Sequence, residues 1–349
     1  MGAIGFQDVF RQLKADLIGK DSHRGITLTY AWMANQFGHF SLGFIPTLFV
    51  HLLITKSSSL THPVIWATVI VCMSWLVFEL CNFLAPLLLR KKLSKNKVPF
   101  HFQPDWKNIA FDTFTDLCFF WLGAFVAALY LSMEFYFIIG SIALSVLALF
   151  FCHHWYRTKM YLQAAQYPFQ FRLSQWMGEI NEDDIKTIRQ FLDNGKPGTH
   201  LFVYGSKRSG KTSLSIGIGT ELSIRHNVCL YTTAMKLYCM FFESEEQQFT
   251  GTKIPWNWRD TSLLIIDDIN PGQPIMKDIV SAEEFLNIVD TFLDRNDTNR
   301  TLIRSKQVIW VLGNENREAA HLNWQGMLEK IDVEKKDILC IRLSEGVEK

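Results

Sequence analysis

The chain has 349 residues, enough for two domains, and its 35 basic and 34 acidic residues nearly cancel. That balance argues against nucleic-acid binding through bulk positive charge, and the seven cysteines show no paired CxxC spacing that would indicate a disulfide framework or a zinc site. The mean hydropathy of +0.08 is high for a water-soluble protein, and nearly all the long apolar runs lie before residue 157.

Residues 1–36 are expected to form an amphipathic N-terminal segment. Apolar residues from Phe6 to Ile18 recur at helical spacing, with Asp8 and Arg11 on the opposite face. The start of the chain does not resemble a signal peptide, and Phe6 stands where a myristoylation motif requires Ser or Thr. The helix is compatible both with packing on the protein and with lying in the membrane interface.

Residues 37–156 are expected to form a transmembrane domain. Each of four apolar segments, at 37–55, 63–84, 110–131 and 135–154, has about the 20 residues that a spanning helix needs. The first is weaker because it contains two histidines and Pro46. Four spans are therefore predicted, with three spans and a re-entrant first segment as the alternative.

Basic residues in the short loops predict the orientation. Six of them lie in the 85–109 loop, and Arg157 and Lys159 follow the fourth segment, whereas the 132–134 loop has none. Because cytoplasmic loops are enriched in Lys and Arg, we expect the N-terminus and the C-terminal half in the cytoplasm. This is the arrangement of an integral protein of the bacterial inner membrane.

Three acids lie at apparent membrane depth: Glu79, Asp112 and Asp116. Asp112 and Asp116 are one turn apart and share a helix face. They indicate either a polar seam or ion path between helices, or aspartates at the cytoplasmic interface near Lys107. The spacing favours the interface for the aspartates and does not decide for Glu79.

Residues 157–180 are predicted to form a juxtamembrane linker, since aromatic residues alternate there with Arg and Lys as in a stretch leaving the headgroup region.

Residues 181–349 are predicted to form a globular α/β domain. It opens with a helix that begins at Asn181 and three acids and ends at Gly195, with Pro197 beyond.

The stretch GSKRSGKT follows the apolar strand HLFVYG and precedes a helical pattern. A strand followed by G-x-x-x-x-G-K-[ST] and then by a helix predicts a phosphate-binding loop. In such a loop, successive backbone N–H groups and the helix N-terminus face the phosphates. Lys211 would contact the β- and γ-phosphates, and the Thr212 hydroxyl would hold Mg²⁺. The candidate nucleotide-binding residues are Gly205, Ser206, Lys207, Arg208, Ser209, Gly210, Lys211, Thr212 and Ser213.

Two later strands end in polar residues that suit the same site. TSLLIIDDIN has the form of a Walker B strand, so Asp267 is the candidate metal-binding acid and Asp268 the candidate to orient or deprotonate the attacking water. QVIWVLGNEN closes on Asn314, at the position of a sensor residue for the γ-phosphate. A structural turn is the alternative for Asn314.

Together these motifs resemble the additional-strand (ASCE) branch of P-loop NTPases, over roughly residues 180–343. One resemblance is to AAA+ ATPases of the helicase-loader and transposition-helper type, and it is carried by LFVYGSKRSGKTSL together with LLIIDDI. The stretch IDDI, in a chain with transmembrane helices, also resembles the KAP group of membrane NTPases. The resemblance implies a parallel five-stranded sheet of order 5-1-4-3-2, preceded here by an all-α four-helix transmembrane domain and lacking the AAA+ lid. It also implies ATP and Mg²⁺ as cofactors, and Asp268 replaces the Glu that many relatives carry.

The same resemblance implies a homo-oligomer with an arginine finger supplied in trans. Arg317 is the favoured candidate, with Arg295, Arg300 and Arg304 as the others. The expected function is a membrane-anchored ATPase whose nucleotide state and assembly rearrange the transmembrane bundle, as in phage-defence or exclusion effectors. The alternatives are a membrane-anchored motor or loader acting on DNA or protein in conjugation, packaging or secretion, and a nucleotide-dependent scaffold; nucleic acid as a partner stays open.

Overall fold

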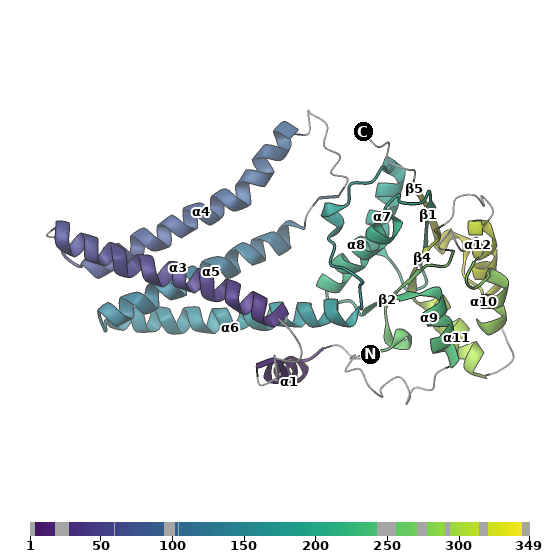
Figure 1. Cartoon of the computed structure of the whole chain (residues 1–349), viewed down its shortest axis with the longest axis horizontal. Coiled ribbons are helices and arrows are strands. Elements are labelled where there is room, and N and C mark those ends of the chain that lie inside the picture. Colours follow the sequence, from purple (N-terminus) through teal and green to yellow (C-terminus); the bar gives the residue numbers. More distant parts are fainter. Residues whose placement is uncertain are drawn as a thin grey trace. The chain divides into compact units, whose positions relative to one another are not determined.

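The computed structural model of the chain describes residues 4–17, 28–58, 60–93, 102–103, 105–242, 256–270, 278–289, 294–313 and 320–343. The chain divides into two compact units. The helical unit comprises Gly5–Val98 and Pro104–Arg157, and the sheet unit consists mainly of Thr158–Lys349. Figure 1 labels the helices and strands of both units.

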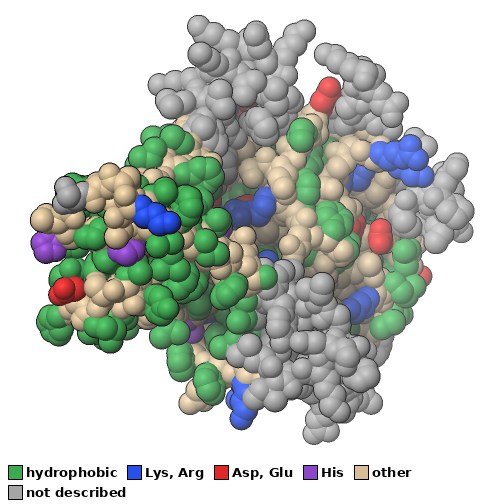
Figure 2. All heavy atoms as spheres, turned by 60° about the vertical axis from the view of Figure 1, so that its left-hand side comes forward, with side chains coloured by type: hydrophobic (Ala, Val, Ile, Leu, Met, Phe, Trp, Pro, Cys, Tyr) green, Lys and Arg blue, Asp and Glu red, His purple; other side chains and the backbone are tan. Residues whose placement is uncertain are grey.

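The helical unit contains α1 (Phe6–Leu17), α3 (Leu28–Ser57), α4 (Pro63–Leu93), α5 (Trp106–Leu131) and the greater part of α6 (Phe135–Ala164). Among the described residues, four stretches are long and apolar enough to cross a membrane: Trp32–Ser57, Pro63–Leu84, Trp106–Leu131 and Phe135–Ala164. They coincide with the four apolar segments of the sequence. Figure 2 shows hydrophobic side chains crowding the surface of these helices, where Phe49, Ile142 and Leu149 are each more than half exposed. Such a surface suits lipid and is unfavourable in water.

α3 continues as a single helix through Pro46. A proline inside a helix leaves the carbonyl four residues earlier without its usual donor. Here that carbonyl belongs to Leu42, and the indole Nε1 of Trp75 on α4 donates to it at 2.9 Å. The neighbouring helix thus satisfies the polar group that the proline frees, as a membrane interior requires.

α3 and α5 cross at two glycines. A Cβ on Gly43 would lie 1.9 Å from the Phe120 carbonyl oxygen, and one on Gly123 would lie 2.0 Å from that of Phe40. Only residues without a side chain allow the two backbones this close, which is a common way for membrane helices to pack.

One acid of the helical unit, Asp116, is paired across two helices. Asp116 on α5 accepts from the Gln36 amide at 3.3 Å and lies 2.9 Å from His39 Nδ1, both on α3. Asp116 is therefore part of a polar seam between α3 and α5, rather than an aspartate surrounded by interfacial water. Glu79 is buried within the same unit.

The described residues of the sheet unit form a five-stranded parallel sheet. Its strands are β1 (His200–Gly205), β2 (Cys229–Thr233), β3 (Leu263–Asp267), β4 (Gln307–Val311) and β5 (Ile338–Leu343). The order is β2-β3-β4-β1-β5. A strand order has no preferred end, and counted from β5 it is 5-1-4-3-2, the order that the resemblance implies.

Helices cover both faces of this sheet. The face of Leu201, Val203 and Ile265 packs against α7 (Glu182–Asn194) and α8 (Lys211–Ile224), and the face of Phe202 packs against the other helices. Those helices are α9 (Ala234–Phe242), α10 (Ala282–Val289), α11 (Asp294–Ser305) and α12 (Ala320–Lys330). Because strand side chains alternate between faces, the near-continuous apolar strands are those of a sheet buried on both sides.

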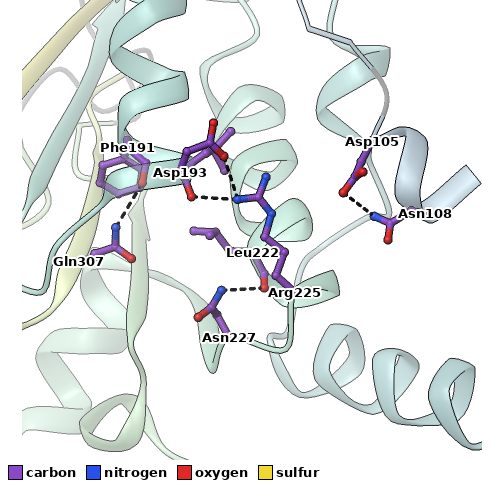
Figure 3. A network of polar contacts seen from close by, with 9 residues as sticks. Asp105, Asn108, Phe191, Asp193, Leu222, Arg225, Asn227 and Gln307 are labelled. Carbon is purple, nitrogen blue, oxygen red and sulfur yellow. Dashed lines mark hydrogen bonds and ion pairs between the residues drawn. The ribbon is translucent and has the colours of Figure 1, made fainter.

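Polar contacts fasten α7 beside α8 and the sheet (Figure 3). Arg225, which follows α8, donates to the carbonyl of Leu192 and to the Asp193 carboxylate, each at 3.0 Å. Gln307 at the start of β4 donates to the carbonyl of Phe191 at 3.4 Å. These contacts hold the last turn of α7 near the N-terminal ends of the strands. The candidate site lies at the opposite, C-terminal ends.

Candidate functional site

At two positions in the loop between β1 and α8, only glycine fits the backbone conformation and the space available. Gly205 has φ +130, and a Cβ there would lie 1.9 Å from the Leu343 carbonyl oxygen on β5. Gly210 has φ +83, and its Cβ would lie 2.9 Å from the indole Nε1 of Trp176. The two glycines let the chain turn sharply out of β1 and enter α8 at Lys211.

Lys211 is the centre of this loop. Its side chain is buried, and its ammonium donates to the carbonyl oxygens of Gly205, at 3.0 Å, and of Ser206. Ser206 and Ser209 are also buried, whereas Lys207 and Arg208 are exposed. A fixed cation thus lies at the N-terminal end of α8, where the helix dipole also favours an anion.

Thr212 and Ser213 complete the predicted set of loop residues. Both lie half-buried in the first turn of α8, directly after Lys211. The structure therefore places Gly205 to Ser213 in one continuous turn of chain at the carboxyl end of β1.

Asp267 is the last residue of β3 and is buried. Its Oδ2 accepts from the Tyr231 hydroxyl of the neighbouring β2 at 2.8 Å, and its Oδ1 accepts from the Asp268 N–H at 2.8 Å. Burial, and secondly the charge of Asp267, raise the pKa of Tyr231 far above its usual value, so the phenol remains a donor. Two donors therefore hold the Asp267 carboxyl group in a fixed orientation.

Asp268 differs from its neighbour. It is exposed and has a left-handed backbone with φ +55, which is uncommon outside glycine. Partial desolvation, followed by the charge of Asp267, raises the pKa of its carboxyl. The Asp268 carboxyl therefore lies beside the fixed Asp267 side chain at the end of β3.

The loop and the two acids lie at the same edge of the sheet. β4 separates β1 from β3, which is the feature that gives the additional-strand branch its name. Leu201, Ile309 and Ile265 are in register across the three strands. Positions of β1 and β3 that are in register are therefore about 10 Å apart, two strand spacings, and Asp267 is level with Val203, two residues before the end of β1. This distance leaves room for a phosphate and a metal ion between the Lys211 loop and Asp267.

Asn270 is a residue that the sequence analysis missed. It is buried three positions after Asp267, and its side-chain oxygen accepts from the N–H of Gly313, two residues after the end of β4. The loop after β3 thus fixes the end of β4 at the residue that precedes Asn314. Asn314 and Arg317 themselves lie outside the described residues.

The other arginine candidates are placed in part. Arg300 and Arg304 lie in α11, and Arg304 forms an exposed ion pair with Asp332 at 3.5 Å. The helix that carries Arg295 is described, and its side chain is not.

The expected linker 157–180 is instead largely part of the sheet unit. We call residues 165–176, which directly follow α6, the strap. Tyr161, Leu173 and Trp176 are almost fully buried, and Leu173 and Trp176 belong to the core cluster on the α8 face. Two of the aromatic residues that suggest a headgroup region in the sequence, Tyr161 and Trp176, are buried in protein, whereas Phe169 is exposed.

The strap touches both halves of the candidate site. Its Ala165 carbonyl accepts from the N–H of Tyr231 at 2.8 Å, on the residue whose hydroxyl holds Asp267. At its other end the Trp176 indole donates to the Gly210 carbonyl at 2.9 Å. Between them Arg172 makes a bidentate ion pair with Glu221 of α8, with a shortest distance of 2.8 Å. Neither Trp176 nor Tyr231 belongs to a sequence motif, so sequence reasoning passed over both.

Comparisons with known proteins give limited information. No protein-family model matches the chain, and no curated protein matches it. A solved structure with similarity is the crystal structure of DnaI, which is 18% identical with a TM-score of 0.33, over 52% of this chain and 91% of that chain. At this TM-score the likeness adds nothing to the site; the chain's own strand order and loop geometry are those of a P-loop NTPase-like fold.

Proposed function

We propose that the protein is a membrane-anchored ATPase that couples nucleotide binding and hydrolysis in the cytoplasm to rearrangement of its transmembrane helices. ATP with Mg²⁺ would supply the phosphoryl group and the charge-neutralising cation. Lys211 and the backbone of Gly205 to Ser213 would bind the phosphates, and Thr212 and Asp267 would hold the metal. Asp268, with its raised carboxyl pKa, would orient or deprotonate the attacking water.

The observation that carries the coupling is the strap. It follows α6, the last apolar helix, without a break and ends in a hydrogen bond to the phosphate-binding loop. On the way it bonds to Tyr231, the partner of Asp267. A change of loop or metal ligands on nucleotide binding therefore has a short path of hydrogen bonds to the end of a membrane helix.

The proposal includes a homo-oligomer. Catalysis by a P-loop NTPase of this branch commonly uses an arginine from a neighbouring subunit. Arg317, which follows the sensor position Asn314, is the candidate we favour; Arg304 is already paired with Asp332. Nucleotide-dependent assembly would then be the event that the helical unit responds to.

Lys211→Ala tests the site. The buried ammonium makes charge-assisted hydrogen bonds that would be transferred to phosphate, each worth about 1.5–3 kcal/mol, so ATP affinity should fall by about 100-fold or more. ATP binding is measured by equilibrium dialysis on the full chain in detergent. Lys330→Ala, which removes an exposed lysine at the end of α12 and outside the phosphate-binding loop, is the matched control and should bind ATP nearly as the wild type does. Equal affinity of Lys211→Ala and wild type would refute the site.

Asp268→Asn separates an ATPase from a scaffold. Asn keeps the shape of the side chain and cannot accept a proton, so binding should persist while the turnover rate falls by about 10²–10⁴. Phosphate release at saturating ATP gives this rate. A variant that hydrolyses ATP as fast as the wild type would remove Asp268 from the chemistry, and a wild type without turnover would favour the scaffold.

A further inference from the structure

A cavity of about 500 Å³ lies within the sheet unit, between α8 on one side and the last turns of α6 with the strap on the other. Its size is that of a small-molecule site. Thr220 and Ile224 line it from the C-terminal half of α8, whereas the phosphate-binding loop precedes that helix. The cavity is therefore separate from the candidate nucleotide site.

The charged groups of the cavity wall already have partners within the protein. None of the described residues that line it is acidic, and its two basic residues are Lys159 and Arg172. Arg172 makes the bidentate ion pair with Glu221, and Lys159 also takes part in an interaction within the protein. A charged ligand would have to replace these interactions, so the wall favours an uncharged ligand.

Three glutamine amides give the wall its hydrogen-bonding capacity. Gln163 and Gln170 are exposed lining residues, and each amide offers both a donor and an acceptor. The third is Gln175, whose side-chain oxygen accepts from the N–H of Arg172 at 2.9 Å, a bond that does not use its NH₂ group. A primary amide matches the adjacent donor and acceptor on the edge of an adenine ring.

The rest of the wall is aromatic and aliphatic. Tyr167 and Phe171 line the cavity together with Leu162 and Ile224. The Tyr167 hydroxyl is already hydrogen-bonded to Ser223 at 2.9 Å, so this residue offers its ring rather than its polar end. Aromatic side chains beside polar amides are the combination with which proteins hold a nucleobase, by its flat face and by its edge.

We propose that this cavity binds an uncharged purine nucleoside, with the base against the apolar wall and its polar edge on the glutamine amides. The proposal does not depend on the proposed function, because the phosphate-binding loop contacts phosphates that a nucleoside lacks. Since strap residues line the cavity, a bound nucleoside would stabilise the strap against α8, the helix that begins at that loop.

The test is equilibrium dialysis of radiolabelled adenosine against the purified full chain in detergent, with radiolabelled uridine in parallel. The wild type should bind adenosine about fivefold more tightly than uridine, because the larger base stacks over more aromatic surface. Gln170→Leu should weaken adenosine binding about fivefold, as expected for the loss of one hydrogen bond. Leu162→Trp, which fills the cavity without changing charge, should weaken it further.

Gln190→Leu is the matched control. Gln190 is an exposed glutamine of α7 and lies outside the cavity, so this change removes the same amide from the same unit. It should leave adenosine affinity within about twofold of wild type. A circular dichroism spectrum like that of the wild type shows that each variant is folded.

Four outcomes overturn the proposal. Equal adenosine affinity of wild type, Gln170→Leu and Leu162→Trp would show that adenosine binds elsewhere. Displacement of adenosine by ATP, at the concentrations that fill the phosphate-binding loop, would assign adenosine to the candidate nucleotide site. Equal affinity for adenosine and uridine would remove the purine preference. No adenosine binding, in a chain that binds ATP, would remove the nucleoside site and leave the proposed function standing.

Discussion

Trp176 is placed where a single side chain can govern the shape of the phosphate-binding loop. Its indole donates to the Gly210 carbonyl at 2.9 Å, at the last residue before α8. Its ring is nearly fully buried and lies edge-on to Phe102, with ring centres 6.2 Å apart. A buried side chain of the strap therefore holds the loop by a hydrogen bond, so the conformation of the loop depends on the position of the strap.

Trp176→Phe should weaken ATP binding about fivefold. The phenyl ring keeps most of the packing, and the change removes one hydrogen bond worth about 1 kcal/mol at the point where the loop enters α8. Isothermal titration of ATP into the detergent-solubilised chain measures the affinity. Trp256→Phe is the control, because Trp256 likewise donates to a backbone carbonyl, that of Cys229 at 3.1 Å. Cys229 begins β2, at the edge of the sheet away from the loop. Loss of affinity in both variants alike would mean that general destabilisation, not loop support, is responsible.

At the scale of elements, β1 joins the site to the core and begins with a fully buried histidine. His200 Nδ1 accepts from the indole N–H of Trp310 on β4 at 3.1 Å, so the ring is neutral with its proton on Nε2. Protonation would turn the acceptor into a donor facing the indole N–H. Burial accordingly lowers the pKa of His200 from 6.5 to about 3.

This histidine should make the sheet unit sensitive to acid. Above pH 6.5 both the folded and the unfolded chain carry a neutral His200, and its contribution to stability is fully present. Below 6.5 the unfolded chain takes up the proton and the folded chain does not, so stability falls until pH reaches about 3. Between pH 7.5 and 5 the loss should be about 2 kcal/mol. His200→Gln keeps an acceptor for Trp310 and does not titrate, so its free energy of unfolding in urea should fall less over that range. Parallel pH profiles for the two proteins would contradict the assignment.

Regular elements with a strong local pattern were predictable from sequence. The strand and loop around Gly205 follow from an apolar run ending in two spaced glycines, and the spans follow from apolar runs of membrane length. Pro46 made the first span ambiguous because its compensation, the Trp75 donor, comes from another helix. The strap was missed for the same reason: its partners Tyr231, Glu221 and Gly210 are distant in sequence.

One local signal for the strap was present in the sequence. Gly217 and Gly219 lie inside the helix that follows the loop, where glycine is unfavourable. In the structure a Cβ on Gly217 would lie 3.0 Å from Leu173 Cα, and one on Gly219 would lie 2.6 Å from the Tyr167 hydroxyl. Glycines in mid-helix therefore indicate close approach of another segment, although they do not identify which one.

At the scale of the whole molecule, the proposed function depends on whether the candidate nucleotide site and the end of α6 respond together. The strap supplies two points of contact, Ala165 at β2 and Trp176 at the loop, with the Arg172–Glu221 ion pair between them. A ligand can shift such an arrangement only through a difference in affinity between two states. A bound nucleotide that orders the loop and Asp267 should therefore order the strap as well. The reason is that the hydrogen bonds of Gly210 and Tyr231 end on strap residues, Trp176 and Ala165.

Hydrogen–deuterium exchange of the full chain in detergent, with and without ATP and Mg²⁺, tests this. ATP should slow exchange in residues 205–213, in the strap and in the last turns of α6, since exchange reports local opening on this timescale. Lys211→Ala should show no ATP-dependent change in any of the three, because it does not bind the nucleotide. Trp176→Phe, at ATP concentrations that saturate it, should retain the protection of the loop and lose part of that in the strap. Protection confined to the loop in the wild type would show that nucleotide binding stops at the sheet and does not reach the membrane helices.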